Sequence, residues 1–194
     1  MSMFEIVFSP TGGTEKVSGL VTGALDGNIV TVDLTDSGLD FHGVSMAKGD
    51  VAVISVPSYA GRVPAVAVER LGMVRGNGAR AVLVCVYGGR AFEDTLIELE
   101  DVAKRAGFRV VAAVSAIAEH SVARQFAAGR PDAQDVAQLS EFAQRIRQKL
   151  LDEAASEPSI PGNRPYKQVG GHSMVPHATE DCVSCGACAA LCPV

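Results

Sequence analysis

The sequence has no tryptophan, few aromatic residues (5%) and no excess of positive charge. Its formal net charge of −5 argues against a nucleic-acid partner, because nucleic-acid binders normally present a basic face. Its apolar runs, such as residues 51–56, are far too short to span a bilayer, and residues 1–8 do not resemble a signal peptide. These absences predict a protein without a membrane span, a secretion signal or a nucleic-acid partner.

Cysteine is scarce except at one place. Four of the five cysteines form the run Cys182-x-x-Cys185-x-x-Cys188-x-x-x-Cys192, which a proline follows. This spacing is typical of the iron–sulfur-binding run of bacterial-type ferredoxins, so it predicts a 4Fe-4S cluster held by these thiolates. Oxidation would threaten such a run, which favours a cytoplasmic location. Cys85 stands alone in an apolar run and is predicted to be a small core residue.

Zinc is the main alternative ligand for the cysteine run, because paired cysteines also bind zinc. Zinc ribbons usually separate their pairs by a longer stretch, whereas these thiols all fall within residues 182–192. In two-cluster ferredoxins the fourth cysteine binds the other cluster, and no second run is present in this sequence. We therefore expect a ferredoxin module that is truncated and that assembles its cluster poorly.

Short apolar runs alternate with helical patterns from the N-terminus to Leu150. The runs predicted to be strands cover residues 4–8, 28–34, 51–56, 81–86 and 110–114. A first helix carries Val17, Leu20, Val21 and Ala24 on one face, and further helices are predicted over 64–74, 91–106 and 133–150. Pro131 is expected in the first turn of the last helix, and Gly107 is expected to end the third. The alternation predicts an α/β fold with a doubly wound parallel sheet.

The composition changes after Leu150. Residues 156–177 contain prolines and glycines but no helical or strand periodicity. We therefore predict a globular domain over residues 1–151, an extended Pro/Gly-rich linker over 152–178 and a partial ferredoxin module over 179–194. The linker is expected to let the cysteine module move relative to the domain.

The loop Ser9-Pro10-Thr11-Gly12-Gly13-Thr14 separates the first predicted strand from the first helix. A doubly wound fold presents backbone N–H groups and a helix N-terminus to an anion at this position. The loop has no lysine after its second glycine and no G-x-G-x-x-G pattern, so neither a Walker-type nor a dinucleotide site is favoured. Its hydroxyls suit a single phosphate monoester, and a capped helix start is the alternative.

The motif Ser9-x-Thr11-Gly12-x-Thr14 resembles the phosphate loop of the flavodoxin family, (Ser/Thr)-x-Thr-Gly-x-Thr. The order of predicted elements over residues 1–150 is also similar to that of flavodoxins. This resemblance implies a flavodoxin-like sheet of five parallel strands in the order 2-1-3-4-5. It also implies that Ser9, Thr11, Gly12, Gly13 and Thr14 bind the phosphate of flavin mononucleotide (FMN), with residues 1–151 as the FMN-binding domain.

Two further loops, residues 57–64 and 86–90, follow strands at the edge where doubly wound folds bind ligands. Each offers a tyrosine, glycines and an arginine, which suit stacking on a flavin ring and contacts to its polar edge. The residues expected to contact the flavin are Pro57, Ser58, Tyr59, Ala60, Gly61, Tyr87, Gly88, Gly89 and Arg90, with the two tyrosines stacking. Arg62 and Arg90 are alternatively ordinary surface charges. His120 and Ser121 could border the flavin, although a lone histidine is more often a polar surface or capping residue.

Several tracts resemble a group of flavoproteins in which a flavodoxin domain precedes a ferredoxin-like 4Fe-4S domain in one chain. They are Pro57-x-Tyr59-x-Gly61-Arg62-x-Pro64, Tyr87-Gly88-x-Arg90-x-x-x-Asp94, Glu119-His120-Ser121 and Gly129-Arg130-Pro131-Asp132. The resemblance implies an electron-transfer flavoprotein that passes electrons between FMN and iron–sulfur clusters, to or from redox protein partners. The alternatives are a flavin-dependent reductase of a quinone or other small acceptor, and a phosphate-ligand module with a structural zinc. No catalytic triad, paired-carboxylate site or NAD(P) fingerprint is recognisable.

Overall fold

Five parallel strands form the centre of the protein. The structure, a computed structural model, describes residues 2–25, 28–152, 154–170, 177–190 and 192. The strands lie in the order β2-β1-β3-β4-β5 and are β1 (Met3–Val7), β2 (Ile29–Asp33), β3 (Val51–Pro57), β4 (Arg80–Tyr87) and β5 (Arg109–Ile117). All five predicted strands are confirmed, and so is the flavodoxin-like order.

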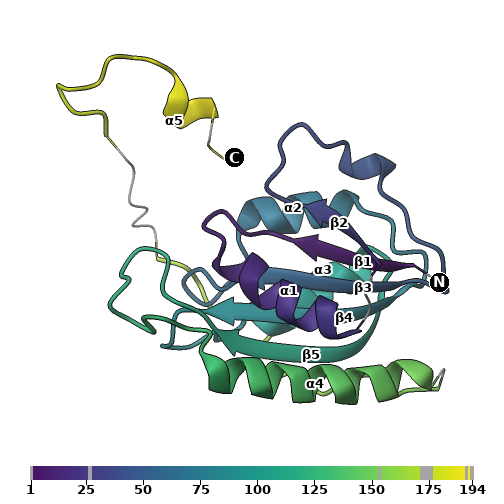
Figure 1. Cartoon of the computed structure of the whole chain (residues 1–194). Coiled ribbons are helices and arrows are strands. Elements are labelled where there is room, and N and C mark those ends of the chain that lie inside the picture. The colour runs from purple at the N-terminus through teal and green to yellow at the C-terminus, as the bar shows by residue number, and fades with distance from the viewer. Residues whose placement is uncertain (1, 26–27, 153, 171–176, 191, 193–194) are drawn as a thin grey trace.

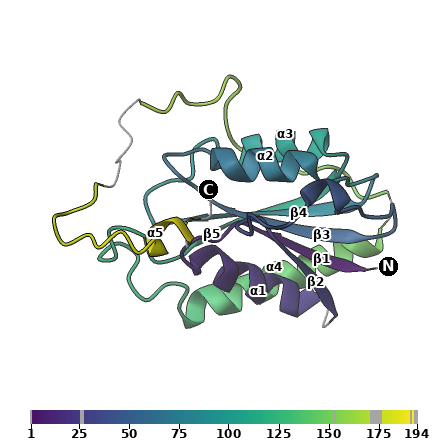
Figure 2. The same cartoon turned by 90° about the horizontal axis from the view of Figure 1, so that it is seen from above.

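Helices cover both faces of this sheet. The helices α1 (Gly13–Leu25) and α4 (Ala133–Leu151) lie on one face, and α2 (Ala65–Met73) and α3 (Thr95–Arg105) lie on the other (Figures 1 and 2). A 3-10 turn (Phe41–Gly43) and the short α5 (Ala187–Ala190) are the other helical elements that the described ranges contain. Among those ranges, no helix is both long and apolar enough to cross a bilayer.

The strand β3 shows why the sheet needs helices on both faces. All of its residues are buried. Because side chains alternate along a strand, Val51 and Val53 join the cluster beneath α1 and α4. Ala52, Ile54 and Val56 join the cluster beneath α2 and α3. The continuous apolar run therefore stabilises both layers at once, as expected of a central parallel strand.

Two helix starts differ from the predictions. The helix α3 begins at Thr95 rather than near residue 91, because Glu93 has φ +44°, which an α-helix does not accommodate. Pro131 lies outside the first turn of α4, since the N-cap is Asp132. The Asp132 side chain accepts from the N–H groups of Gln134 and Asp135, so a capping box starts this helix.

Residues 154–169, which we call the strap, follow α4 and lie along α3. The strap has no helix or strand, which agrees with its proline and glycine content. It is nevertheless docked: Asn163 N–H and Lys167 N–H donate to the Asp94 carboxylate at 2.8 and 2.6 Å. Arg164 donates to Asp101 at 2.7 and 2.8 Å. The division of the chain at residues 151 and 178 stays a prediction, but the strap is not a free linker.

Candidate functional site

The loop after β1 forms the start of α1. Gly12 adopts φ +80°, a conformation that glycine reaches without a steric penalty. The Ser9 hydroxyl accepts from the N–H of Glu15 at 2.9 Å, so this side chain caps the helix. The first amides of a helix have no acceptor within the helix, and they carry the positive end of its dipole. The structure therefore shows the capped helix start, and phosphate binding by this loop stays a prediction.

The loop after β3 is a tight reversal at residues 59–62. Tyr59 and Arg62 exchange two backbone hydrogen bonds of 3.0 Å. The two residues between them, Ala60 and Gly61, have φ of +53° and +83°, which is the signature of a type I′ turn. The turn leaves the Tyr59 side chain 40% exposed at the carboxyl edge of the sheet. Partial burial raises the pKa of its phenol, so the ring stays neutral under ordinary conditions.

The loop after β4 approaches the segment that follows β5. A Cβ on Gly88 would lie 2.6 Å from Cδ2 of His120, so only glycine fits this approach. Tyr87 contacts Phe92 edge to face, with ring centroids 5.4 Å apart. Ser58 shares a 2.7 Å hydrogen bond with the Thr95 hydroxyl, which joins the β3 loop to the start of α3.

The segment after β5 folds back on itself as a loop. His120 N–H donates to the carbonyl of Phe126 at 3.1 Å. The ring nitrogen Nδ1 of His120 accepts from the N–H groups of Val122 and Ala123 at 3.2 and 3.1 Å. In its neutral form this histidine therefore carries its proton on Nε2. Two apolar side chains of the loop, Val122 and Phe126, are exposed by 71% and 58%.

These four loops enclose one cleft of about 410 Å³ at the carboxyl ends of the strands. Ligand sites of open α/β sheets occupy this edge, and the volume is within the usual range for small-molecule sites. Of the predicted cofactor residues, the cleft is lined by Thr11, Gly13, Thr14, Pro57, Ser58, Tyr59, Ala60, Tyr87 and Gly88. It is also lined by Pro10, Val86, Ala118, Glu119, His120, Ser121 and Val122.

Five predicted contact residues do not line this cleft: Ser9, Gly12, Gly61, Gly89 and Arg90. The glycines shape the turns, with φ of +80°, +83° and +92° at Gly12, Gly61 and Gly89. Sequence reasoning missed Ala118 and Val122 in the wall after β5, because these apolar residues carry no motif. It pointed to His120 and Ser121 because they follow a predicted strand, within the tract Glu119-His120-Ser121.

The two arginines suggested for the flavin face elsewhere. The Arg62 guanidinium binds both carboxylate oxygens of the buried Glu98, at 2.7 and 2.6 Å. It also lies 4.8 Å from the ring centroid of Tyr166 in the strap. The Arg90 side chain is 76% exposed and pairs with Glu93 at 2.6 Å. The surface-charge alternative therefore describes Arg90, whereas Arg62 forms an ion pair with a buried glutamate.

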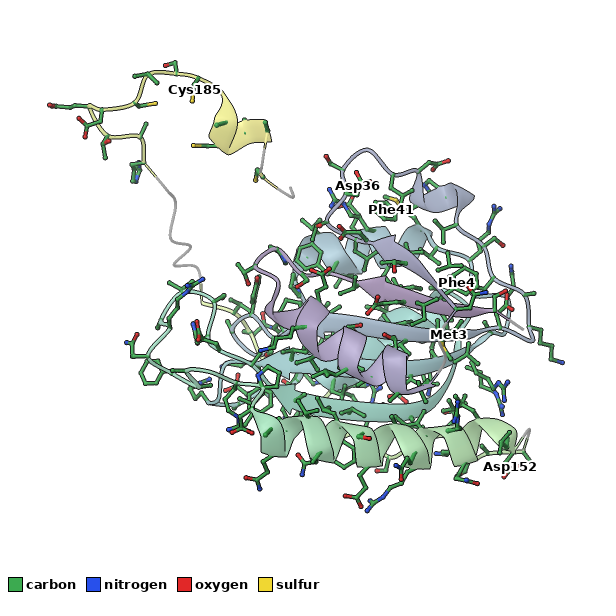
Figure 3. The ribbon with its side chains drawn as sticks, viewed as in Figure 1. Met3, Phe4, Asp36, Phe41, Asp152 and Cys185 are labelled. Atoms are coloured by element: carbon green, nitrogen blue, oxygen red, sulfur yellow. The ribbon has the colours of Figure 1, made fainter. Side chains whose placement is uncertain are left out.

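The cysteines divide into one buried and four exposed residues. Cys85 is fully buried in β4, which confirms its place in the core, and burial raises the pKa of its thiol. The exposed cysteines are Cys182, Cys185, Cys188 and Cys192. Figure 3 labels Cys185 on the segment that follows the strap. Within the described part of the chain, no three His, Cys, Asp or Glu side chains are grouped so that they could hold a metal ion.

Known structures share this fold. The two-electron-reduced flavodoxin of Megasphaera elsdenii matches with a TM-score of 0.51 at 15% identity, over 74% of this chain and 98% of that one. The flavodoxin of Streptococcus pneumoniae TIGR4 matches at 0.50 and 20% identity, over 76% and 99%. Rubredoxin oxygen:oxidoreductase of Desulfovibrio gigas matches at 0.53 and 13% identity, over 77% of this chain and 36% of that one.

These likenesses concern the architecture, because the sequence identities are low. No family model matches the chain, and no curated protein matches it closely enough to count as a relative. The shared features are the five-stranded parallel sheet, its strand order and its covering helices. The chain therefore has a flavodoxin-like α/β fold, with its cleft at the carboxyl edge of the sheet.

Proposed function

We propose that the cleft binds FMN and that the protein is an electron-transfer flavoprotein. The observation that carries this proposal is convergence: the open start of α1 and the two tyrosine-bearing loops line one cleft. Solved structures of the same fold include two flavodoxins and an oxygen:oxidoreductase, which supports a flavin-dependent redox role. A cytoplasmic location and redox protein partners belong to the same proposal.

The residues of the cleft fit FMN by type. The exposed Thr11 hydroxyl and the first amides of α1 would hold the phosphate, where helix N-termini favour negative charge. The Ser9 hydroxyl accepts from the N–H of Glu15 as a cap, and its O–H is still available to donate to the phosphate. Tyr59 and Tyr87 would flank the ring, and backbone groups of residues 58–60 would face its polar edge. When bound, FMN supplies the capacity to take up or release one or two electrons.

We also propose that Cys182, Cys185, Cys188 and Cys192 hold an iron–sulfur cluster. The support is their spacing and the chemistry of four thiols that are all exposed. Ser184 and Gly186, between the cysteines, have φ of +54° and +76°, so the chain already turns sharply within the run. Convergence of the sulfur atoms would accompany binding, because metal-site formation and local folding are commonly one event.

The first test is flavin content. Anaerobic purification followed by release and chromatography of flavin should give about one FMN per chain. Thr11→Glu places a negative charge at the phosphate position and should weaken FMN binding by at least about 100-fold. Ser140→Glu, on the exposed side of α4, is the matched control and should leave the affinity unchanged. No flavin after incubation of the wild-type protein with excess FMN would contradict the proposal.

The second test separates iron from zinc. Anaerobic reconstitution with iron and sulfide should give iron, acid-labile sulfide and visible absorbance in the wild-type chain, but less than the four irons per chain of a full cluster, because the run is expected to assemble its cluster poorly. A chain with Cys185→Ser should lose most of all three, while Cys85→Ala should keep them because Cys85 is buried in the sheet. Zinc in place of iron would favour the structural-zinc alternative, even where FMN binds.

A further inference from the structure

The strap carries the chain from one end of the sheet to the other. Just before the strap, Arg80 donates to the Leu150 carbonyl at the end of α4, and at the start of the strap Arg109 donates to the Ala155 carbonyl at 3.5 Å. Both arginines are the first residues of their strands, and Figure 3 labels Asp152 at the same end of α4. At the other end of the strap, Arg62 donates to the Lys167 carbonyl at 2.9 Å. The chain thereby returns from the amino edge to the carboxyl edge of the sheet (Figure 2).

The strap ends beside the cleft. Val169 lines an apolar groove together with Phe8, Pro10 and Tyr59, and two of these residues also line the cleft. The distance covered is about one strand length, which for the nine residues of β5 is ~30 Å. The four cysteines therefore follow an anchor point at the cleft, although the globular domain itself ends at the opposite edge with α4.

The docking contacts are part of the structure of α3. Asp94 is only 3% exposed, and a buried carboxylate needs hydrogen-bond donors. Its side chain accepts from Asn163 N–H, Asn163 Nδ2 and Lys167 N–H, all within the strap. The backbone N–H of Asp94 donates to the carbonyl of Gly61, in the loop after β3. One residue thus joins the strap to a loop of the cleft.

A glycine determines how closely the strap approaches α3. Gly162 has φ +140°, and a Cβ at this position would lie 2.4 Å from Cγ2 of Ile97. Further along the strap, Arg164 binds Glu100 and Asp101, and the Tyr166 hydroxyl donates to Asp101. Any side chain at position 162 would push the strap away from α3 and weaken these bonds together.

We infer that the strap is a positioning segment, which holds the cysteine run within reach of the flavin cleft. The inference rests on the proposed function for the identity of the two redox groups, but the anchoring is a property of the chain alone. Only residues 170–181 separate Val169 from Cys182. A Gaussian reference chain of twelve residues has an average span of ~20 Å, and a reference chain that runs from residue 151 to Cys182 has one of ~30 Å.

The docked strap changes where the cysteines concentrate. With the anchor at the cleft, the effective concentration of Cys185 should be roughly tenfold higher at the cleft than at the amino edge. When the strap is released, the tether of the cysteine run begins at the end of α4, at the amino edge of the sheet. The effective concentration of Cys185 should then be higher at the amino edge than at the cleft. The strap thereby makes the flavin cleft, rather than another surface, the natural partner of the cysteine run.

Cross-linking of the flavin-free and metal-free chain tests this inference. Cys182, Cys188 and Cys192 are replaced by serine, so that Cys185 is the reactive thiol of the run, while Cys85 is buried and its raised pKa keeps it unreactive. A second thiol is introduced either at the cleft rim, as Val122→Cys, or at the amino edge, as Lys48→Cys. A bis-maleimide should join Cys185 to the rim position roughly tenfold faster than to the amino-edge position.

Gly162→Val should reverse this ratio to below one and speed hydrogen exchange of residues 160–169. Gly170→Val is the matched control, because no atom lies within 4 Å of the position its Cβ would take, and it should change neither quantity. If Gly162→Val speeds hydrogen exchange of residues 160–169 but leaves the cross-linking ratio unchanged, the inference is overturned. Unchanged exchange in a Gly162→Val/Arg164→Ala double variant would also overturn it, because these contacts would then not hold the strap. Absence of FMN binding would contradict the proposed function. The cross-linking result could still be interpreted, because it is measured on the flavin-free and metal-free chain.

Discussion

The loop of residues 9–14 and the cysteine run are both clear motifs in the sequence, yet their structures differ. Residues 9–14 lie between a buried strand and a helix, and the core fixes where both begin. The cysteine run follows the strap, and all of its cysteines are exposed without grouping into a site among the described residues. A motif inside the fold receives its geometry from the core, whereas a motif outside it must obtain geometry from its ligand.

Core substitution should separate the two regions most strongly. Ile54 of β3 is fully buried beneath α2 and α3, and Ile54→Ala should lower the free energy of unfolding by about 2–5 kcal/mol. Val183→Ala removes a side chain that is 82% exposed, so it should change stability by less than about 0.5 kcal/mol. Urea denaturation of both variants measures the difference. Equal effects would show that the cysteine run is packed against the domain.

A substitution at Gly88 tests whether the cleft depends on the close approach of its loops. The added Cβ of Gly88→Ala would overlap His120, so the loop after β5 must move. We expect a loss of about 1–3 kcal/mol in stability and weaker FMN binding. Gly19→Ala is the matched control, because its Cβ meets nothing within 4 Å in a helix interior. That change should raise stability by about 0.5–1 kcal/mol and leave FMN affinity unaltered. Unchanged FMN binding in Gly88→Ala would contradict the proposal that FMN binds in this cleft.

The same contrast explains which features sequence reasoning could find. The strands and helices were predictable because the apolar residues that pack into the core on the two faces of the sheet occur as short runs in the strands and at helical spacing in the helices. The cleft loops at residues 9–14, 57–60 and 87–88 were predictable because they follow strands whose carboxyl ends meet at one edge. The docking of the strap was not, since it depends on buried acids such as Asp94, which lies 69 residues from its partner Asn163. Such pairings leave no periodic trace in a segment rich in proline and glycine.

Acid should release the strap before it unfolds the domain. The backbone amides of Lys167 and Asn163 hold the pKa of Asp94 below its usual value, and Arg164 and Tyr166 do the same for Asp101. A lowered folded-state pKa contributes stability above the unfolded-state pKa, near 3.9, and that stability is lost as the pH falls through the folded-state pKa. The protection of residues 160–169 from hydrogen exchange, relative to the intrinsic exchange rate at each pH, should therefore fall below about pH 4. Strap release near neutral pH, with the core still protected, would show that other groups hold it.

Removal of metal should have the smallest effect on the domain. If the four cysteines acquire order from a cluster, chelation should abolish slow hydrogen exchange in residues 177–190, because ligand binding and local folding are linked there. The melting temperature of the α/β domain should change by no more than about 1 °C, since the core clusters contain no residue of the cysteine run. The Cys185→Ser variant, taken through the same reconstitution with iron and sulfide, is the control for nonspecific effects of iron. A large shift in melting temperature on chelation would show that the cluster packs on the domain, and the two regions would then form one cooperative unit.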